Sequence, residues 1–265
     1  MNLLKRELAP LTDDAWAEID EQAGRMLRSL LTARRFADVS GPHGAGFAAV
    51  STGRMKLADG NRFGVDQFGV REALPLVEVR IPFELSIWEL DNVARGARDV
   101  NLEPLEKAAA SLAGFEEGLL YSGAAEAGVP SLFDALDHEP VRCKSDPEHL
   151  LAGLAEAVSR LKASAVDGPY ALVLDPTMWT SIYSYVHGRP LEEHLQYLLS
   201  GPILLSAYTL SPFVISLRGG DLELVLGQDA AIGYQRRNDE TVELFVTESL
   251  TYRVLDGSAA ITLQT

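Results

Sequence analysis

The chain has 265 residues, of which 47% are hydrophobic and 23% charged, a composition typical of folded globular proteins and unlike that of disordered or collagen-like chains. The formal net charge of −15 and the lack of any long Lys/Arg run argue against nucleic acid as a partner, because phosphate neutralisation needs such runs. Cys143 is the single cysteine, so no intrachain disulfide forms, and the chain is compatible with a reducing cytoplasm.

We expect neither an export signal nor a membrane span. Lys5, Arg6 and Glu7 stand where a secretory signal would need its apolar stretch. The segment 195–217 carries no charge and is nominally long enough to cross a bilayer, but Gly-Pro at 201–202 and Ser-Pro at 211–212 interrupt any helix there. This segment therefore predicts the end of a helix followed by two buried strands, at 203–208 and 213–217.

The first predicted element is a helix that begins after Thr12, a typical N-cap residue. Its apolar positions recur at steps of three and four residues, as expected for a helix with one covered face: Trp16, Ile19, Ala23, Leu27, Leu30 and Leu31. The chain then becomes glycine-rich, and 55–80 alternates loosely around Asp59-Gly60 and Phe68-Gly69, which predicts a long two-stranded ribbon. Because such a ribbon is marginal in isolation, we expect another surface to hold it, such as that of a neighbouring subunit.

The middle of the chain predicts helices separated by clear breaks. A second long helix covers 102–121, with Pro104 in its first turn and Ser122-Gly123 at its end. A third begins at Ser145, whose spacing to Glu148 is that of a capping box, and ends before Asp167. The remaining predicted elements are, in order, a strand at 170–175, a helix at about 176–185, a loop at 187–190, a helix to 199 and several strands to the end.

The glycine-rich segment 218–235 does not have the spacing of a nucleotide-binding loop. Neither GxxxxGK[ST] nor a GxGxxG that opens a helix is present. Gly219-Gly220 predicts a tight hairpin turn, and Gly227 a bulge or a close approach of the backbone. This segment is therefore interpreted as framework.

Other catalytic and metal-binding patterns are also missing. The histidines form no HExxH and do not pair with the cysteine: His43, His138, His149, His187 and His194. No carboxylate pair stands out, since the adjacent Glu116 and Glu117 cannot share a helix face, and no GxSxG elbow is present. Trp88 between apolar neighbours is interpreted as packed, with a planar ligand such as flavin as the alternative.

Several stretches together resemble one family. They are LKRELAPLTDDAWAEID (4–20), RRFADVSGPHG (34–44), AAVSTGR (48–54), WELDNVARG (88–96), DGPYALVL (167–174), RGGDLELVLGQDAAIGY (218–234) and LFVTESLTY (244–252). They are similar to encapsulins, the linocin-type nanocompartment shell proteins of bacteria and archaea. The similarity runs from Met1 to about Leu263.

The resemblance implies an α+β chain with the HK97-type phage capsid fold, made of a P-domain, an A-domain and an extended E-loop. The expected division is 1–46 for the N-terminal helix and arm on the inner wall, 47–83 for the E-loop, 84–134 for the P-domain with its spine helix, 135–217 for the A-domain, 218–254 for P-domain hairpin strands, and 255–265 for a C-terminal strand that returns to the A-domain.

The resemblance further implies a self-assembling icosahedral shell of about sixty copies or a multiple, located in the cytoplasm, without catalysis or cofactor of its own. Its partners are copies of itself and cargo enzymes with a C-terminal targeting peptide, either a ferritin-like iron oxidase or a dye-decolourising peroxidase. Such cargo enzymes act in iron storage and in the response to oxidative stress, and small solutes or iron would enter the shell through pores. No metal site, nucleic acid or membrane is implied.

Two sets of site residues follow from the same resemblance. The cargo-peptide pocket would use Leu27, Leu30, Leu31, Arg34, Phe36, Asp38 and Ile232, although some of these residues simply pack the core in the alternative interpretation. The pore would be lined by Tyr185, His187, Gly188 and Arg189. Two other functions stay open from the sequence: a phage or prophage major capsid protein of the same fold, and a hydrolase.

Overall fold

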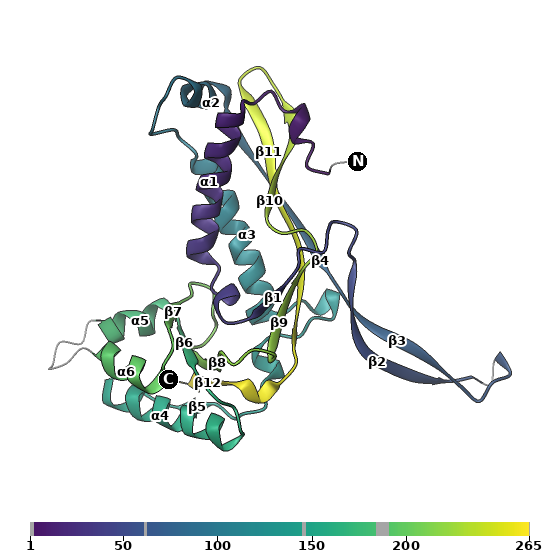
Figure 1. Cartoon of the computed structure of the whole chain (residues 1–265), viewed down its shortest axis with the longest axis vertical. Helices are drawn as coiled ribbons and strands as arrows, with labels where there is room; N and C mark the ends of the chain where they lie inside the picture. Colours follow the sequence, from purple (N-terminus) through teal and green to yellow (C-terminus); the bar gives the residue numbers. More distant parts are fainter. Residues whose placement is uncertain (1–2, 61–62, 145–146, 184–190, 265) are drawn as a thin grey trace.

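The computed structural model describes residues 3–60, 63–144, 147–183 and 191–264. Two sheets and their helices form the body of the molecule, and a two-stranded ribbon projects away from it (Figure 1). The helices are α1 (Asp13–Leu30), α2 (Ile87–Ala94), α3 (Glu103–Ser122), α4 (Pro147–Ala163), α5 (Pro176–Tyr183) and α6 (Leu191–Leu199). None of those in the described ranges has the length and apolar character that a membrane crossing requires.

The first sheet is built around β11 (Thr241–Val254), which has a neighbour along each of its sides. β4 (Val77–Ser86) pairs with one side, and β10 (Ala231–Arg237) and β9 (Leu222–Leu226) follow one another along the other, all antiparallel. β1 (Asp38–Ser40) adds to β9 in parallel. Helices α1 and α3 pack together beside this sheet (Figure 1).

The predicted N-terminal helix is confirmed as α1. The side chain of Thr12 accepts a hydrogen bond from Ala15 N at 3.2 Å, which satisfies one of the backbone donors that a helix start leaves free. Trp16, Ile19 and Ala23 are buried against α3 and the strands of the first sheet. The predicted stripe is thus the covered face of the helix.

The predicted second helix is confirmed as α3, and its end is set by glycine. Gly123 has a φ of +72°, and a Cβ there would lie 2.7 Å from backbone atoms of Pro130 and Ser131. Only glycine therefore lets the chain leave α3 and pass close to the segment that follows.

The second sheet has the order β5-β12-β8-β6-β7, with strands β5 (Val141–Arg142), β12 (Ala260–Gln264), β8 (Phe213–Ser216), β6 (Tyr170–Leu174) and β7 (Ile203–Leu205). Every residue of β6 is buried, as expected for a strand covered on both faces. Helices α4, α5 and α6 contribute apolar side chains to the core beside it. The last strand of the chain, β12, thus joins a sheet whose other members come from the middle of the sequence.

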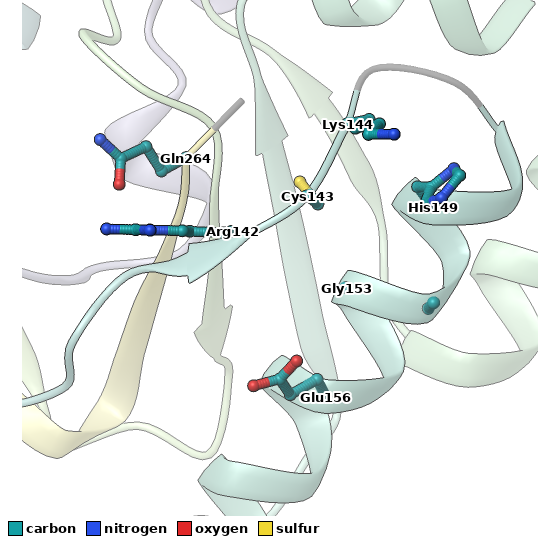
Figure 2. Close-up of a pocket in the computed structure, with 8 residues that line it drawn as sticks. Arg142, Cys143, Lys144, His149, Gly153, Glu156 and Gln264 are labelled. Carbon is teal, nitrogen blue, oxygen red and sulfur yellow. The ribbon is translucent and has the colours of Figure 1, made fainter.

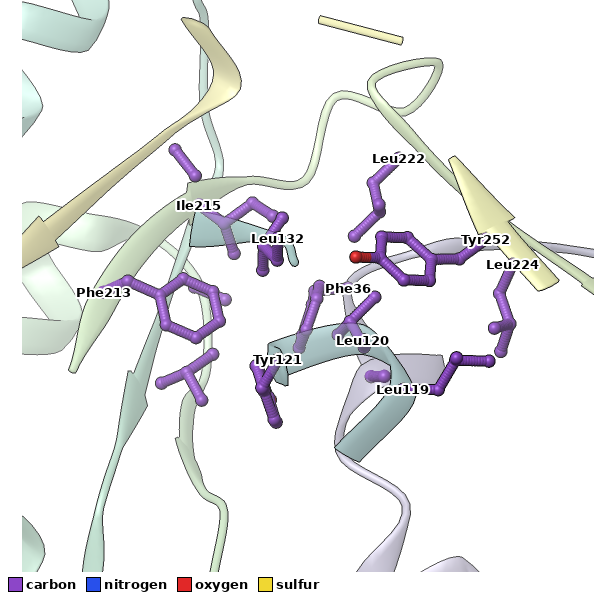
Figure 3. Packing of buried hydrophobic residues seen from close by; sticks show 14 of the residues in the cluster. Phe36, Leu119, Leu120, Tyr121, Leu132, Phe213, Ile215, Leu222, Leu224 and Tyr252 are labelled. Carbon is purple, nitrogen blue, oxygen red and sulfur yellow. The ribbon is translucent and has the colours of Figure 1, made fainter. Parts of the chain in front are cut away.

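A shared apolar core joins the two sheets (Figure 3). The ring of Phe213 packs edge-on against Phe36 at 5.6 Å and against Tyr121 at 6.0 Å, centroid to centroid. The Tyr252 hydroxyl donates a hydrogen bond to the carbonyl oxygen of Pro130. Since these side chains come from β8, α3, β11 and the segment after α1, the two sheets pack as parts of one body.

The ribbon consists of β2 (Ala49–Asp59) and β3 (Gln67–Pro75), paired antiparallel. It begins and ends earlier than the predicted span 55–80, because Val77–Arg80 belongs to β4 in the first sheet. Apolar and polar residues alternate with the same period in β3 and in β4, so the sequence pattern could not locate the boundary between these two strands. Nearly every ribbon residue is exposed.

Two local predictions were wrong. Gly219 and Gly220, with φ of +81° and +82°, form a bend, but the strands on either side, β8 and β9, belong to different sheets and make no hairpin. Trp88 is 69% exposed on α2 instead of packed, because α2 buries Leu90 and turns the tryptophan outward, toward the guanidinium of Arg95. Gly227 is a close backbone approach as predicted, since a Cβ there would meet Ser249 and Leu76.

Candidate functional site

The predicted cargo-pocket residues begin on the last turn of α1. Leu27 and Leu30 are half-buried, and Leu31, the C-cap residue, is 7% exposed. Leu27 packs against the cluster that contains Ile232, a buried residue of β10. The structure therefore places Leu27 beside the apolar cluster to which Ile232 belongs, with only the leucine partly open to solvent.

Arg34 lies in the short 3-10 turn η2 (Ala33–Arg35) directly after α1 and binds three carboxylates. Its Nη2 lies 2.7 Å from Glu116 Oε2 and 2.5 Å from Glu248 Oε1, and its Nε lies 2.9 Å from Glu116 Oε1. Its Nη1 lies 2.9 Å from Asp229 Oδ1. The arginine thus links the end of α1 to α3, β11 and the loop before β10. Its own side chain is 22% exposed.

The charged groups of this cluster shift the pKa values of one another. Burial would lower the pKa of Arg34, but the hydrogen bond to Glu116 and the three negative charges raise it above its ordinary value, so the guanidinium stays charged. Burial raises the pKa of Glu248 to about 9; the charges of Glu116 and Asp229 add to this, while Arg34 opposes it. The Glu116 and Glu248 side chains are 0% and 1% exposed, whereas Asp229 is 44% exposed. Asp229 and, to a smaller extent, Arg34 connect the cluster to solvent.

Glu117 forms a second buried contact on another side of α3. Its Oε1 accepts hydrogen bonds from the backbone N–H groups of Thr32 at 2.6 Å and Ala33 at 2.7 Å, and Ser206 donates to Oε2 at 3.3 Å. Burial raises the pKa of this carboxyl, against the lowering effect of the two N–H donors. Glu117 satisfies backbone donors of the segment that follows α1 and so fixes the direction in which the chain continues to Arg34.

The sequence did not single out either glutamate. They are adjacent and do lie on different sides of α3, but both sides are covered, one by Arg34 and β11 and the other by the turn after α1. A signal was available: α3 carries apolar residues on several sides, for example Ala108, Ala109 and Leu112, and a helix that is apolar all round is typically buried.

The remaining predicted pocket residues point elsewhere. Phe36 is buried in the core between the sheets, and Asp38 Oδ2 accepts a hydrogen bond from Gly220 N at 2.5 Å while remaining exposed. The seven residues therefore do not form one open patch. Leu27, Leu30, Arg34 and Asp38 are at least partly accessible, and Leu31, Phe36 and Ile232 are packed behind them. The predicted pore residues, Tyr185, His187, Gly188 and Arg189, lie outside the described residues.

A separate cavity of about 490 Å³ lies between β5, the start of α4 and the end of β12 (Figure 2). Arg142 and Gln264 line one end, and Cys143 points toward α4, where Gly153 leaves room for it. Burial raises the pKa of the Cys143 thiol, which makes it a weak nucleophile. Within the described ranges, no three metal-ligating side chains are grouped to hold an ion. The cavity thus offers neither an activated nucleophile nor a metal centre.

Comparison with known proteins gives a consistent result. The family model described as "Encapsulating protein for peroxidase" matches residues 1–251. A type 1 encapsulin shell protein of Mycolicibacterium paratuberculosis is 38% identical over 264 residues, covering 99% of each chain. The type 1 encapsulin shell protein of Rhodospirillum rubrum is 35% identical, covering 100% of this chain and 97% of the relative.

Solved structures agree on the fold. The virus-like particle from Pyrococcus furiosus matches with a TM-score of 0.65 at 20% identity, covering 94% of this chain and 99% of that chain. The capsid of Myoviridae Phage XM1 matches with a TM-score of 0.56 at 14% identity, covering 88% and 91%. The fold is the α+β HK97-type capsid fold that the sequence resemblance implied, and the chain belongs to the encapsulin shell-protein family.

Proposed function

We propose that copies of this chain assemble into a closed icosahedral shell of about sixty subunits or a multiple. The observation that carries this proposal is the ribbon, which presents apolar side chains on both of its faces. Strand alternation and the pairing register put Met55 and Leu57 on one face and Phe68 and Val70 on the other. Leu57 is 63% and Val70 54% exposed.

Met55, Leu57 and Val70 are each more than half exposed, and Phe68, 36% exposed, packs edge-on against Phe63 near the end of the same ribbon. Full burial of one such side chain is worth about 1.5–3 kcal/mol, so a neighbour that covers both faces stabilises the ribbon and the contact between subunits together. A two-stranded ribbon is only marginally stable alone. Membership of the shell-protein family supports a second copy as the covering surface.

Negative-stain microscopy of the purified full chain tests this proposal. We expect uniform hollow particles, with sedimentation at the mass of a closed shell. A monodisperse monomer at high protein concentration would refute it.

We further propose that the inner wall binds a targeting peptide at the C-terminus of a cargo enzyme, either a peroxidase or a ferritin-like iron oxidase. The family description names encapsulation of a peroxidase, which supports this class of cargo. The end of α1 offers the partly accessible apolar side chains of Leu27 and Leu30, followed closely in the chain by the charged Arg34, which suits an extended peptide with aliphatic side chains.

Cargo binding is tested by fusing the C-terminal tail of a peroxidase or ferritin-like protein encoded beside this chain to a fluorescent protein. Co-expression should load the fusion into wild-type shells and not into shells that carry Leu30→Asp. Ser164→Asp, at an exposed polar position just after α4, serves as a control for the added charge. Equal loading of a tailless fluorescent protein would contradict the proposal.

In this function the shell protein itself is not the catalyst, resides in the cytoplasm, and has neither membrane nor nucleic acid as a partner. Relatives 34–38% identical over nearly the whole chain are named shell proteins, which favours a compartment over a hydrolase or a phage capsid. Passage of small solutes or iron past Tyr185, His187, Gly188 and Arg189 stays a prediction. Replacing His187 and Arg189 with alanine should change the rate of iron entry into loaded shells.

A further inference from the structure

The carboxylates around Arg34 outnumber the available positive charges. With every group ionised, one arginine would face three acids, Glu116, Glu248 and Asp229, for a formal net charge of −2. Glu116 and Glu248 are fully buried. Uncompensated charge in such a place is costly, because burial removes the water that would solvate it.

The geometry shows where this excess charge is concentrated. Arg34 Nη2 donates to both Glu116 Oε2 and Glu248 Oε1, so the two carboxyl groups meet at one nitrogen atom. Glu248 Oε2 is buried and accepts no hydrogen bond from any described residue. A buried carboxylate oxygen without a donor is unfavourable. A protonated carboxyl instead has an O–H to donate, and Glu116 is within hydrogen-bonding reach of Glu248.

We propose that Glu248 holds a proton in the folded chain and donates a hydrogen bond through it to Glu116, so that the cluster is a proton-dependent clamp between the end of α1, α3 and β11. Arg34 then donates to the carbonyl oxygen of the protonated Glu248 and to the carboxylate of Glu116. The formal charge of the cluster falls from −2 to −1, and the remaining excess lies on the solvent-facing Asp229.

The charged groups that face Glu248 come from three different elements. Arg34 of η2 favours the ionised form, whereas Glu116 of α3 and Asp229 of the loop before β10 oppose it, as does burial, the largest effect. A metal ion is a poorer candidate than a proton for balancing the charge, since among described residues no group of three ligands is arranged to hold one.

The sign of the pH dependence follows. Between the ordinary glutamate pKa of 4.5 and the value of about 9 in the folded chain, the folded state binds one proton more than the unfolded state. This contribution to stability is complete below pH 4.5 and is lost as the pH rises to about 9. Over that range the clamp alone raises the unfolding equilibrium constant about tenfold per pH unit.

The experiment is calorimetric melting of the full-length protein from pH 6 to pH 10, with Glu248→Gln as the variant. Glutamine has the shape and the neutral charge of the protonated acid, so the stability of the variant should not fall as Glu248 ionises in the wild type. The melting temperature of the variant minus that of the wild type should therefore rise up to about pH 9 and be constant at higher pH. Glu243→Gln is the matched control on the same strand, where the carboxyl pairs with the exposed Arg236. The difference in melting temperature between this control and the wild type should be the same at every pH. A difference that is likewise independent of pH for Glu248→Gln would overturn the proposal.

Two further measurements cover the case in which Glu248→Gln does not fold. Glu116→Gln removes the largest negative charge that opposes ionisation of Glu248, so the pH range over which stability falls should narrow; an unchanged pH dependence would overturn the proposal. Infrared spectroscopy of the wild-type protein at pH 7 should show the carbonyl stretch of a protonated carboxyl, decreasing as the pH approaches about 9. The absence of this band at pH 7 would also overturn it.

Discussion

Strand β6 of the second sheet and the two strands of the ribbon all carry large apolar side chains, yet the environments of these side chains are opposite. Tyr170–Leu174 in β6 is entirely buried by the strands and helices of its own chain. The ribbon β2–β3 exposes Leu57 on one face and Phe68 and Val70 on the other. The body is therefore complete within one chain, while the ribbon needs a partner surface, and substitutions in the two regions should affect different properties.

The largest expected effect comes from charge on the ribbon. Leu57→Asp combined with Phe68→Asp should abolish assembly, because each face of the ribbon would carry a charge into the contact between subunits. The chain itself should stay folded, as seen by circular dichroism, with a monomer in size-exclusion chromatography. Ser164→Asp, which adds charge at an exposed polar position outside the ribbon, should still assemble. Normal shells from the double variant would show that the ribbon is not part of the contact.

Within the body, the largest effect should follow from Arg34→Ala. Removal of the guanidinium leaves Glu116 buried without its partner, so the free energy of unfolding should fall by about 3–5 kcal/mol. Chemical denaturation in the assembly-deficient ribbon variant measures this loss without interference from subunit contacts. Arg25→Ala, which breaks an exposed pair with Glu21, should change stability by less than about 1 kcal/mol. Equal effects of the two substitutions would argue against a structural role for the buried cluster.

Replacing a leucine with alanine in each region distinguishes the role of the body from that of the ribbon. Leu172→Ala in β6 should cost about 2–5 kcal/mol of monomer stability, because it leaves a cavity in a packed core. Leu57→Ala on the ribbon should change monomer stability by no more than about 0.5 kcal/mol and instead weaken assembly. A large loss of monomer stability with Leu57→Ala would mean that the ribbon is already packed on its own chain.

The smallest expected effect is at the start of α1. Thr12→Ala removes the acceptor for Ala15 N and should cost about 1 kcal/mol, measured by the same denaturation. Thr12→Ser keeps that acceptor and should restore most of the stability. If serine gave no recovery, the capping hydrogen bond would not be the cause.

Regular elements were largely predictable, because caps and breaks mark them locally. Thr12 starts α1, Gly123 ends α3, and the strand at Tyr170–Leu174 stands between turn residues. The strand boundary at Pro75 was not predictable, since alternation continues from β3 into β4 although the pairing partner changes. Which strand pairs with which depends on contacts far apart in sequence.

Of the candidate site, the sequence identified Arg34 and not the carboxylates that it binds. Arg34 was identified through the family resemblance, but its partners Glu116 and Glu248 come from α3 and β11, far along the chain. Adjacency of Glu116 and Glu117 ruled out a shared helix face and gave no indication that two faces of α3 are buried. Trp88 shows the opposite error: its apolar neighbours in sequence predicted that it would be buried, but its side chain is exposed.

Cryo-electron microscopy of the purified full-length protein tests the central claim most directly. We predict a closed shell in which the ribbon of each subunit lies against a neighbouring subunit, with Leu57 on one face and Phe68 on the other both covered. A ribbon that projects into solvent, or that folds back on its own body in a solitary chain, would contradict it.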